Sequence, residues 1–364
     1  MKTKTMKRLV AILLVTVLMC VGCGGNGTAE NTQETGNTET TGADNGSDST
    51  TDADSADSGA ADAGETKDIT MVLDWAPNTN HTGLYVAQDK GYFSEEGLNV
   101  SIVQPPENGA ADMVASGDAQ FGVEFQDTMA PALSQENPLP ITAVAAILQH
   151  NTSGLVSLKE KGIDSFSKMA GHSYATWDSP TEQAILKTLV EKDGGKWEDV
   201  NLISTYVEDI VAGLKTDIDC VWIYAGWDKI KLDMEGMDNN FLLFKDADPV
   251  FDYYNPVIIS SNAFLESDPD TAKAFLRAVK KGYEYAAANP AEAADILLKS
   301  VPELDEALVK KSQEYLSTQY VADASSWGVI DINRWNAFYK WLNDNKLIEK
   351  ELPEGAGVST DYLE

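Results

Sequence analysis

The sequence predicts an α/β fold in which two lobes each carry a mainly parallel sheet flanked by helices. From residue 69 onward, short apolar runs alternate at close spacing with segments of helical periodicity, which is typical of βαβ units. The folded body is about 300 residues long, beyond the size at which one hydrophobic core usually stops growing. Two lobes are therefore expected.

The first lobe begins with a β-rich run that ends in the loop at residues 76–81. Strands are predicted at residues 69–75, 98–103, 119–125 and 141–149, with helices at 82–89, 109–116 and 127–135 between them. The carboxyl ends of parallel strands are where such sheets bind ligands. The loops that follow these strands are therefore the places to search for a site.

The second lobe has strands predicted at residues 171–177, 201–204 and 218–224. A helix between the first two ends at Lys192, and its start is well marked: Ser179 suits the cap, Pro180 the first helical position and Glu182 the first turn. A strand at 257–260 is expected to return to the first lobe, followed by helices at 269–288, 290–299, 303–319 and 332–345. The predicted division is therefore 68–160 with 257–364 for lobe 1, and 161–256 for lobe 2.

The N-terminus, residues 1–22, has the anatomy of a secretory signal. Basic residues precede an apolar run at 9–19 that is too short to span a bilayer. Gly22 directly before Cys23 resembles the bacterial lipobox, in which the cysteine thiol is diacylated and becomes the new N-terminus. We therefore expect Cys23 to carry a lipid; the alternative is an ordinary secreted signal with an accidental cysteine.

Residues 23–67 are predicted to be a lipidated cysteine followed by a disordered acidic linker. Positions 24–66 contain no aromatic residue, no Lys and no Arg, so this stretch cannot bury enough apolar surface to offset its chain entropy. Its like charges repel one another and extend it. We expect an extracytoplasmic protein that this tether holds at the cell membrane.

Composition excludes several classes of function. The formal net charge of −31 argues against nucleic acid, whose phosphates require Lys and Arg. With Cys20 removed and Cys23 acylated, Cys220 has no partner for an intramolecular disulfide. The three histidines form no metal-binding pair, and no nucleophile elbow, P-loop or dinucleotide fingerprint is present. No catalytic residue, metal or cofactor is predicted.

Aromatic, carboxylate and carboxamide residues gather where the predicted strands end. Flat aromatic faces suit a flat ring, and carboxylates or carboxamides orient its amino groups and ring nitrogens. Core packing is the competing explanation for any single aromatic residue, but the repetition at successive strand ends favours a cleft. The predicted ligand-binding residues are Trp75, Asn80, His81, Glu124, Gln126, Asp127, Trp177, Asp178, Glu182, Trp222, Tyr224, Trp227 and Tyr253.

Arginine usage narrows the ligand further. The chain has only Arg8, Arg277 and Arg334, and none of them lies in a strand-end loop. Receptors for carboxylates, sulfonates and phosphates commonly use the guanidinium fork for bidentate recognition. Helix N-termini and backbone N–H groups remain an alternative way to bind an anion. The pattern favours a neutral or weakly basic ring.

Several segments carry a resemblance to a known family. LDWAPNTNHTGLY at 73–85, AQDKGYF at 87–93, SGDAQFG at 116–122, ATWDSPTEQ at 175–183 and DIDCVW at 217–222 are similar to the thiamin-pyrimidine-precursor-binding branch of ABC-importer substrate-binding proteins. The resemblance covers essentially the whole body. It implies a two-lobed, periplasmic-binding-protein type II fold with two crossover strands, which closes on its ligand by hinge motion.

The resemblance also implies a ligand and partners. The expected ligand is a formylated or hydroxymethyl aminopyrimidine salvaged toward thiamin, handed to an ABC importer permease by a monomeric receptor. Close relatives bind riboflavin or aliphatic sulfonates, so these remain alternatives, although the missing arginine counts against a sulfonate.

The same family includes a eukaryotic pyrimidine synthase that uses lysine-bound pyridoxal phosphate. Its lysine aligns with Glu124 and its histidine with Thr128, and its cysteine cluster, expected near residues 252–256, is absent. A carboxylate cannot form the Schiff base. The sequence therefore predicts a binding protein and not an enzyme.

Overall fold

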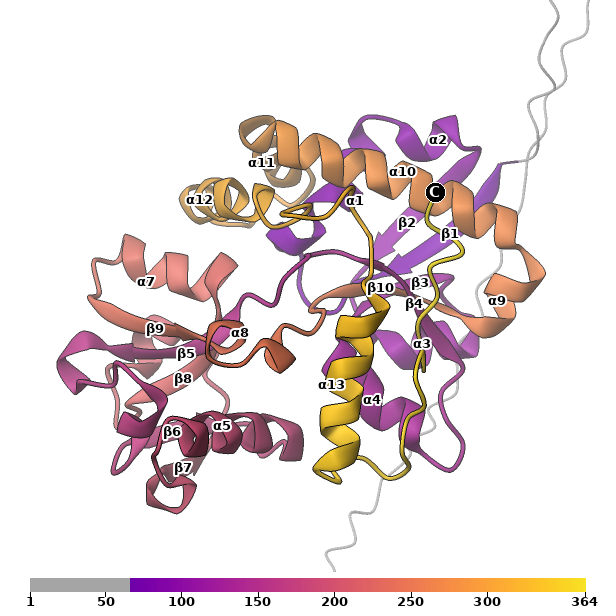
Figure 1. Cartoon of the computed structure of the whole chain (residues 1–364). Helices are drawn as coiled ribbons and strands as arrows, with labels where there is room; N and C mark the ends of the chain where they lie inside the picture. The colour runs from indigo at the N-terminus through magenta and orange to yellow at the C-terminus, as the bar shows by residue number, and fades with distance from the viewer. Residues whose placement is uncertain (1–65) are drawn as a thin grey trace, which may run out of the picture. The chain divides into compact units, whose positions relative to one another are not determined.

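The computed structural model describes residues 66–364, which contain two five-stranded sheets (Figure 1). The predicted signal, the lipidated Cys23 and nearly all of the linker lie outside these residues. The first sheet has the strand order β2-β1-β3-β10-β4. Its strands are β1 (Lys67–Val72), β2 (Leu98–Val103), β3 (Phe121–Glu124), β4 (Ile141–Ala146) and β10 (Val257–Ser261).

The second sheet has the order β7-β6-β8-β5-β9. Its strands are β5 (Ser153–Leu158), β6 (Ser173–Thr176), β7 (Asn201–Ser204), β8 (Cys220–Tyr224) and β9 (Asn239–Leu243). Both sheets are mixed. The strands β1, β2 and β3 are parallel to one another, as are β6, β7 and β8, whereas β10 and β5 run antiparallel to both of their neighbours.

The helices that accompany the first sheet come from both ends of the body. They are α1 (Thr82–Asp89), α2 (Tyr92–Glu95), α3 (Ala110–Ser116), α4 (Gln126–Ser134), α9 (Asn262–Ser267), α10 (Pro269–Ala288), α11 (Pro290–Ser300), α12 (Glu306–Ser317) and α13 (Ile332–Asp344). Those of the second sheet are α5 (Pro180–Lys192), α6 (Ile210–Gly213), α7 (Ile230–Met234) and α8 (Phe244–Ala247). None of the helices in residues 66–364 combines the length and the apolar character needed to cross a membrane.

Each sheet buries both of its faces, because successive strand residues point to opposite sides. In β10, Ile258 packs with α1 and α10, while Val257 and Ile259 pack with α3, α4 and α13. In β8, Trp222 lies on the side of α5, and Val221 lies on the side of α6 and α7. Burial on both faces explains why these strands read as nearly continuous apolar runs.

Glycine permits a close contact between two helices of the first lobe. Figure 1 shows α1 and α10 side by side, and a Cβ atom added at Gly83 would lie 2.2 Å from the ring of Tyr283. A Cβ atom at Gly282 would lie 2.1 Å from the carbonyl oxygen of Gly83. Only hydrogen fits at either position, so this crossing holds α1, and the loop before it, firmly against α10.

Two segments cross between the sheets, one from β4 to β5 and the other from β9 to β10. The return of the chain to the first sheet near residue 257 follows the prediction. The first crossing lies earlier than expected: β5 already pairs with β8 and β9, ahead of the predicted boundary at residue 160. Neither β5 nor β9 is among the strands predicted from the sequence. The strand β5 runs antiparallel to both of its neighbours, β8 and β9, so the second sheet is mixed.

Candidate functional site

The candidate site is built where four strands end. Asp74 lies two residues beyond β1, and Glu124 is the last residue of β3, the parallel neighbour of β1. Trp177 directly follows β6, and Tyr224 ends β8, the parallel neighbour of β6. Carboxyl ends of parallel strands share one edge of a sheet, so each sheet presents its side chains together.

The loop after β1 fixes Asp74 through a buried histidine. His81 Nε2 lies 2.6 Å from Asp74 Oδ1, and the His81 ring is fully buried. The backbone N–H of Asn78 donates to His81 Nδ1 at 3.1 Å. A backbone N–H can only donate, so Nδ1 carries no proton and Nε2–H donates to Asp74. His81 is thus a neutral ring that orients Asp74.

Glu124 is a half-buried carboxylate at the end of β3. Its Oε1 accepts hydrogen bonds from the Phe125 backbone N–H at 3.0 Å and from the Thr128 hydroxyl. Burial raises the pKa of Glu124 to about 7; the two hydrogen bonds oppose this shift, and the nearby carboxylates of Asp74 and Asp127 add to it.

Asp127 stands in the first turn of α4 and has one satisfied and one unsatisfied oxygen. Its Oδ2 accepts from the Tyr253 hydroxyl at 3.2 Å. Its Oδ1 is buried and has no hydrogen-bond partner within residues 66–364. Burial raises the pKa of Asp127 to about 6, against the opposing effect of its hydrogen bonds. An unpaired buried oxygen of this kind is rare and calls for an explanation.

The second sheet brings aromatic residues to the same carboxylates. Asn255, in the crossing segment before β10, donates to the Tyr224 hydroxyl at 3.4 Å. Burial raises the pKa of Tyr224, and the carboxylates of Asp127 and Asp74 raise it further, so the phenol faces both acids. Trp222 is 4% exposed, and its Nε1–H approaches the Tyr224 hydroxyl closely enough to oppose the rise in the Tyr224 pKa, but it makes no hydrogen bond of good geometry in the described part of the chain.

Large aromatic rings extend outward from this group. Trp177 is 41% exposed, and its ring centroid lies 5.6 Å from that of Trp222. Trp75, which follows Asp74, is 59% exposed and lies 6.3 Å from the ring of Tyr206, itself 58% exposed. Trp75 belongs to the first sheet's loops and Tyr206 to the loop after β7. Such exposed aromatics at adjacent strand ends are typical of a binding surface.

Two predicted residues lie beneath the β6 loop or at its bend. Glu182 is almost completely buried and accepts hydrogen bonds from the Tyr174 and Thr176 hydroxyls and from the backbone N–H groups of Trp177 and Ser179. Both of its oxygens are therefore used within the protein. Asp178 is exposed, has a φ of 61°, and accepts from the Ser204 hydroxyl at 2.9 Å. A left-handed non-glycine residue at a strand end is a strained conformation that often marks a functional loop.

Four other predicted residues have strong contacts within the protein. The buried carboxamide of Gln126 donates to Trp335 O at 2.9 Å and accepts from Tyr254 N at 3.0 Å. Tyr253 is buried and stacks on Phe338, so only its hydroxyl reaches the site. Asn80 accepts the Tyr283 hydroxyl through its carbonyl oxygen, and Trp227 packs against the core of the first sheet.

The structure therefore places some of the predicted ligand-binding residues in one group and the others outside that group. We define the acid–indole group as Asp74, Glu124, Asp127, Trp222, Tyr224 and Asn255. Asp74, Asn255 and the outer Tyr206 were not among the predicted residues. Asp74 lies at the end of the strand predicted at 69–75, and Tyr206 follows the strand predicted at 201–204, so the same strand-end criterion would have identified them. Nothing in the sequence indicates Asn255.

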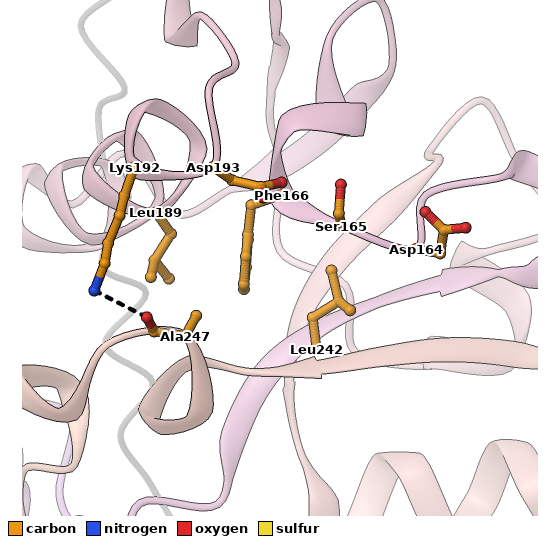
Figure 2. A pocket seen from close by; sticks show the side chains of 8 residues that line it. All are labelled: Asp164, Ser165, Phe166, Leu189, Lys192, Asp193, Leu242 and Ala247. Atoms are coloured by element: carbon orange, nitrogen blue, oxygen red, sulfur yellow. Dashed lines mark hydrogen bonds between the residues drawn. The ribbon is translucent and has the colours of Figure 1, made fainter.

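The hollow in Figure 2 lies elsewhere and has no unpaired polar group. It encloses about 380 Å³ beside α5 and is lined by Phe166, Leu189 and Leu242 together with polar residues. Lys192 donates to the Ala247 carbonyl at 3.0 Å, and Asp193 accepts from the Ser167 backbone at 2.7 Å. Because its charged groups are already paired, we do not assign the ligand to it.

The positions of the arginines and of the potential metal ligands in residues 66–364 are consistent with a ligand site at the acid–indole group. Arg277 pairs with Glu96 and Glu364, and Arg334 pairs with Asp252, so neither guanidinium reaches the acid–indole group. No cluster of His, Cys, Asp and Glu suited to a metal ion occurs among the residues that the structure describes.

Comparisons with known proteins give both a family and a fold. Residues 78–293 match the family model described as NMT1/THI5 like. The chain is 31% identical over 300 residues to a formylaminopyrimidine-binding protein of Halalkalibacterium halodurans, covering 80% of this chain and 89% of that one. It is 25% identical over 276 residues to the 4-amino-5-hydroxymethyl-2-methylpyrimidine phosphate synthase THI11 of Saccharomyces cerevisiae, covering 68% of this chain and 76% of the synthase.

The alkanesulfonate-binding protein SsuA from Xanthomonas axonopodis pv. citri has a similar structure. The TM-score is 0.60 at 12% sequence identity, and the match covers 81% of this chain and 99% of that chain. At this identity the likeness shows the fold alone. It confirms the predicted α/β fold of the periplasmic-binding-protein type II class.

Proposed function

Since the chain belongs to the NMT1/THI5-like family, we propose that it is an extracytoplasmic binding protein that captures a thiamin-precursor aminopyrimidine for an ABC importer. The observation that carries this proposal is the pair of unpartnered polar atoms in the acid–indole group. Asp127 Oδ1 accepts and Trp222 Nε1–H donates, and both are buried without a partner in residues 66–364. Buried polar groups are normally satisfied, so a ligand that bears both a donor and an acceptor accounts for them.

The surrounding side chains fit an aminopyrimidine ring. The amino group and ring nitrogens supply donors for carboxylates and acceptors for an indole N–H. Trp177 is half-exposed against Trp222, and Trp75 and Tyr206 add two exposed aromatic faces for a flat ring. No arginine of residues 66–364 takes part, which disfavours a sulfonate. A formylaminopyrimidine or hydroxymethylpyrimidine satisfies all of these features.

The proposal makes the protein a receptor and not an enzyme, although synthases are among its relatives. The synthase lysine aligns with Glu124, and this side chain accepts hydrogen bonds from Phe125 and Thr128. A carboxylate cannot form an imine with pyridoxal phosphate. Turnover in the presence of pyridoxal phosphate would contradict this part of the proposal.

The proposed location and partners follow from the N-terminal residues that the structure does not describe. A secretory signal at 1–22, a lipid on Cys23 and an acidic linker to residue 67 would hold the monomeric body outside the membrane, within reach of a permease. Mass spectrometry of the membrane-extracted protein tests the lipid. The expected N-terminal peptide begins at a diacylated Cys23, and a Cys23→Ser variant should be released from the membrane.

Calorimetric titration tests the ligand. We expect 4-amino-5-hydroxymethyl-2-methylpyrimidine or its formylaminopyrimidine counterpart to bind saturably to the purified protein. Trp177→Ala should weaken binding by about 1–3 kcal/mol through loss of a stacking face. Trp341→Ala, which removes an indole of α13 that packs edge-on against Phe251, is the matched control for an aromatic residue outside the site. No pyrimidine binding together with tight riboflavin binding would identify a flavin receptor instead.

A further inference from the structure

The acid–indole group contains carboxylates without cations. Neither Glu124 nor Asp127 forms an ion pair within residues 66–364, and their hydrogen bonds come from neutral donors: Phe125 N–H, Thr128 and Tyr253. Asp74 is bonded to His81, which is neutral because its Nδ1 accepts from the Asn78 backbone. Ionised carboxylates removed from water are strongly unfavourable unless a positive charge accompanies them.

The groups that face these carboxylates from the neighbouring elements are also uncharged or acidic. They are Asp74 and His81 after β1, Tyr224 on β8, Tyr253 before β10, Tyr283 on α10 and Tyr339 on α13. Burial and the neighbouring acids keep these four phenols protonated. Among the described residues, the protein therefore provides no counter-charge at this point.

We propose that the site takes its ligand as a cation, a nitrogen heterocycle that carries an added proton when bound and donates N–H groups to Asp127 Oδ1 and Glu124. This inference rests on the proposed function and adds the charge state of the ligand to it. An aminopyrimidine suits this role, because protonation of its ring spreads the positive charge onto the amino group in the manner of an amidinium. The cation restores charge balance and satisfies Asp127 Oδ1 together.

The empty site and the bound site then differ in protonation. Glu124 and Asp127 have pKa values raised to about 7 and about 6, so both are ionised at pH 8 before the ligand arrives. A free aminopyrimidine is neutral at that pH, so the proton on the bound ring comes from the solvent. At pH 5 both carboxylates hold protons already, and binding a cation releases them. The affinity should therefore be highest near neutrality and fall on the alkaline side.

Titration calorimetry in buffers with different ionisation enthalpies measures this directly. With 4-amino-5-hydroxymethyl-2-methylpyrimidine at pH 8 in phosphate and in Tris, we expect uptake of about one proton per ligand bound. The affinity should fall roughly tenfold between pH 8 and pH 9, which is the dependence that uptake of one proton requires. Asp127→Asn should weaken binding and reduce the proton uptake, whereas Glu136→Gln, an exposed carboxylate beyond α4, should change neither.

The results of these titrations distinguish a failure of the cationic-ligand proposal from a failure of the proposed receptor function. Saturable binding at pH 8 without proton uptake, and with an affinity that is constant from pH 7 to pH 9, would overturn the cationic ligand and leave the receptor in place. An Asp127→Asn variant with unchanged affinity and unchanged uptake would overturn the assignment to Asp127. Absence of binding at every pH would contradict the proposed function itself, and this inference with it.

Discussion

Two groups of carboxylates near the crossing segments differ in what accompanies them. In the acid–indole group, Glu124 and Asp127 have no cation and Asp127 Oδ1 has no hydrogen-bond partner within residues 66–364. The second group, which we call the crossing cluster, consists of Asp252 with His150, Asn151 and Arg334. Asp252 lies 2.9 Å from Arg334 Nη1 and 2.7 Å from His150 Nδ1, and it also accepts from the Asn151 backbone at 2.9 Å.

The difference separates carboxylates that hold the fold from those that await a ligand. The crossing cluster connects His150 of one crossing segment to Asp252 of the other and to Arg334 of α13. The carboxylate of Asp252 is therefore already paired within the protein. The acid–indole group has the same kind of side chain without that compensation. Carboxylates without a counter-charge are unfavourable in the empty protein, and a cationic, ring-shaped ligand supplies the missing charge.

Removing Asp252 should have the largest effect on stability. Asp252→Ala removes the carboxylate that pairs with the half-buried Arg334 and leaves the Asn151 N–H without its acceptor, so we expect a loss of about 2–3 kcal/mol in the free energy of unfolding. Urea denaturation at pH 7 measures it. A loss below about 0.5 kcal/mol would show that the crossing cluster is not a structural ion pair.

Replacing Glu124 should increase the free energy of unfolding, whereas replacing Asp252 should decrease it. A carboxyl with a raised folded-state pKa binds its proton more tightly in the folded protein, so stability falls as pH rises from the unfolded value of about 4.5 through about 7. Glu124→Gln keeps an oxygen for Phe125 and Thr128 and should stabilise the ligand-free protein by about 1–2 kcal/mol at pH 8. At pH 4, where both forms are neutral, the gain should vanish.

Trp222→Phe tests the indole N–H apart from the ring. The Nε1–H has no partner in the described residues, so its loss should leave the free energy of unfolding nearly unchanged while the ring contact with Phe244 persists. Ligand affinity should fall about three- to tenfold, the value of one hydrogen bond. If calorimetry gives the same ligand affinity for Trp222→Phe as for the unaltered protein, the Trp222 N–H does not contact the ligand.

Tyr206→Ala should have the smallest effect. The ring is exposed and touches Trp75 at 6.3 Å between centroids, so the unfolding free energy should change by less than about 0.5 kcal/mol. Affinity should fall about two- to fivefold through loss of an aromatic face. Tyr206→Phe retains that face and is the matched control, and an effect of equal size in both variants would indicate a role for the hydroxyl.

The alternation of strands and helices predicted the fold class, the return to the first sheet and most element positions. It did not identify β5, because a long apolar run at 141–149 and the polar Asn151-Thr152 that follows obscured a separate strand. The edge strand β9 is half-exposed throughout, so it lacks the buried alternation that marks a strand in sequence. Antiparallel pairing of β5 and β10 depends on where the chain crosses, which local patterns do not encode.

The sequence predicted which types of residue form the site, but not which individual residues belong to it. Strand-end aromatics and acids were expected, and Glu124, Asp127, Trp222 and Tyr224 do meet. Glu182 shows the limit: its place in the first turn of α5 already indicated a capping role, and the structure places both oxygens beneath the β6 loop. Whether a carboxylate lacks a counter-charge depends on which distant elements face it, and this becomes visible only in the folded protein.

A crystal structure of the complex with 4-amino-5-hydroxymethyl-2-methylpyrimidine would show whether the pyrimidine satisfies the two unpaired atoms. We expect a ring nitrogen or amino nitrogen within about 3 Å of Asp127 Oδ1, and a ring acceptor facing Trp222 Nε1. A pyrimidine bound elsewhere, with both of these atoms still unpartnered, would contradict this expectation.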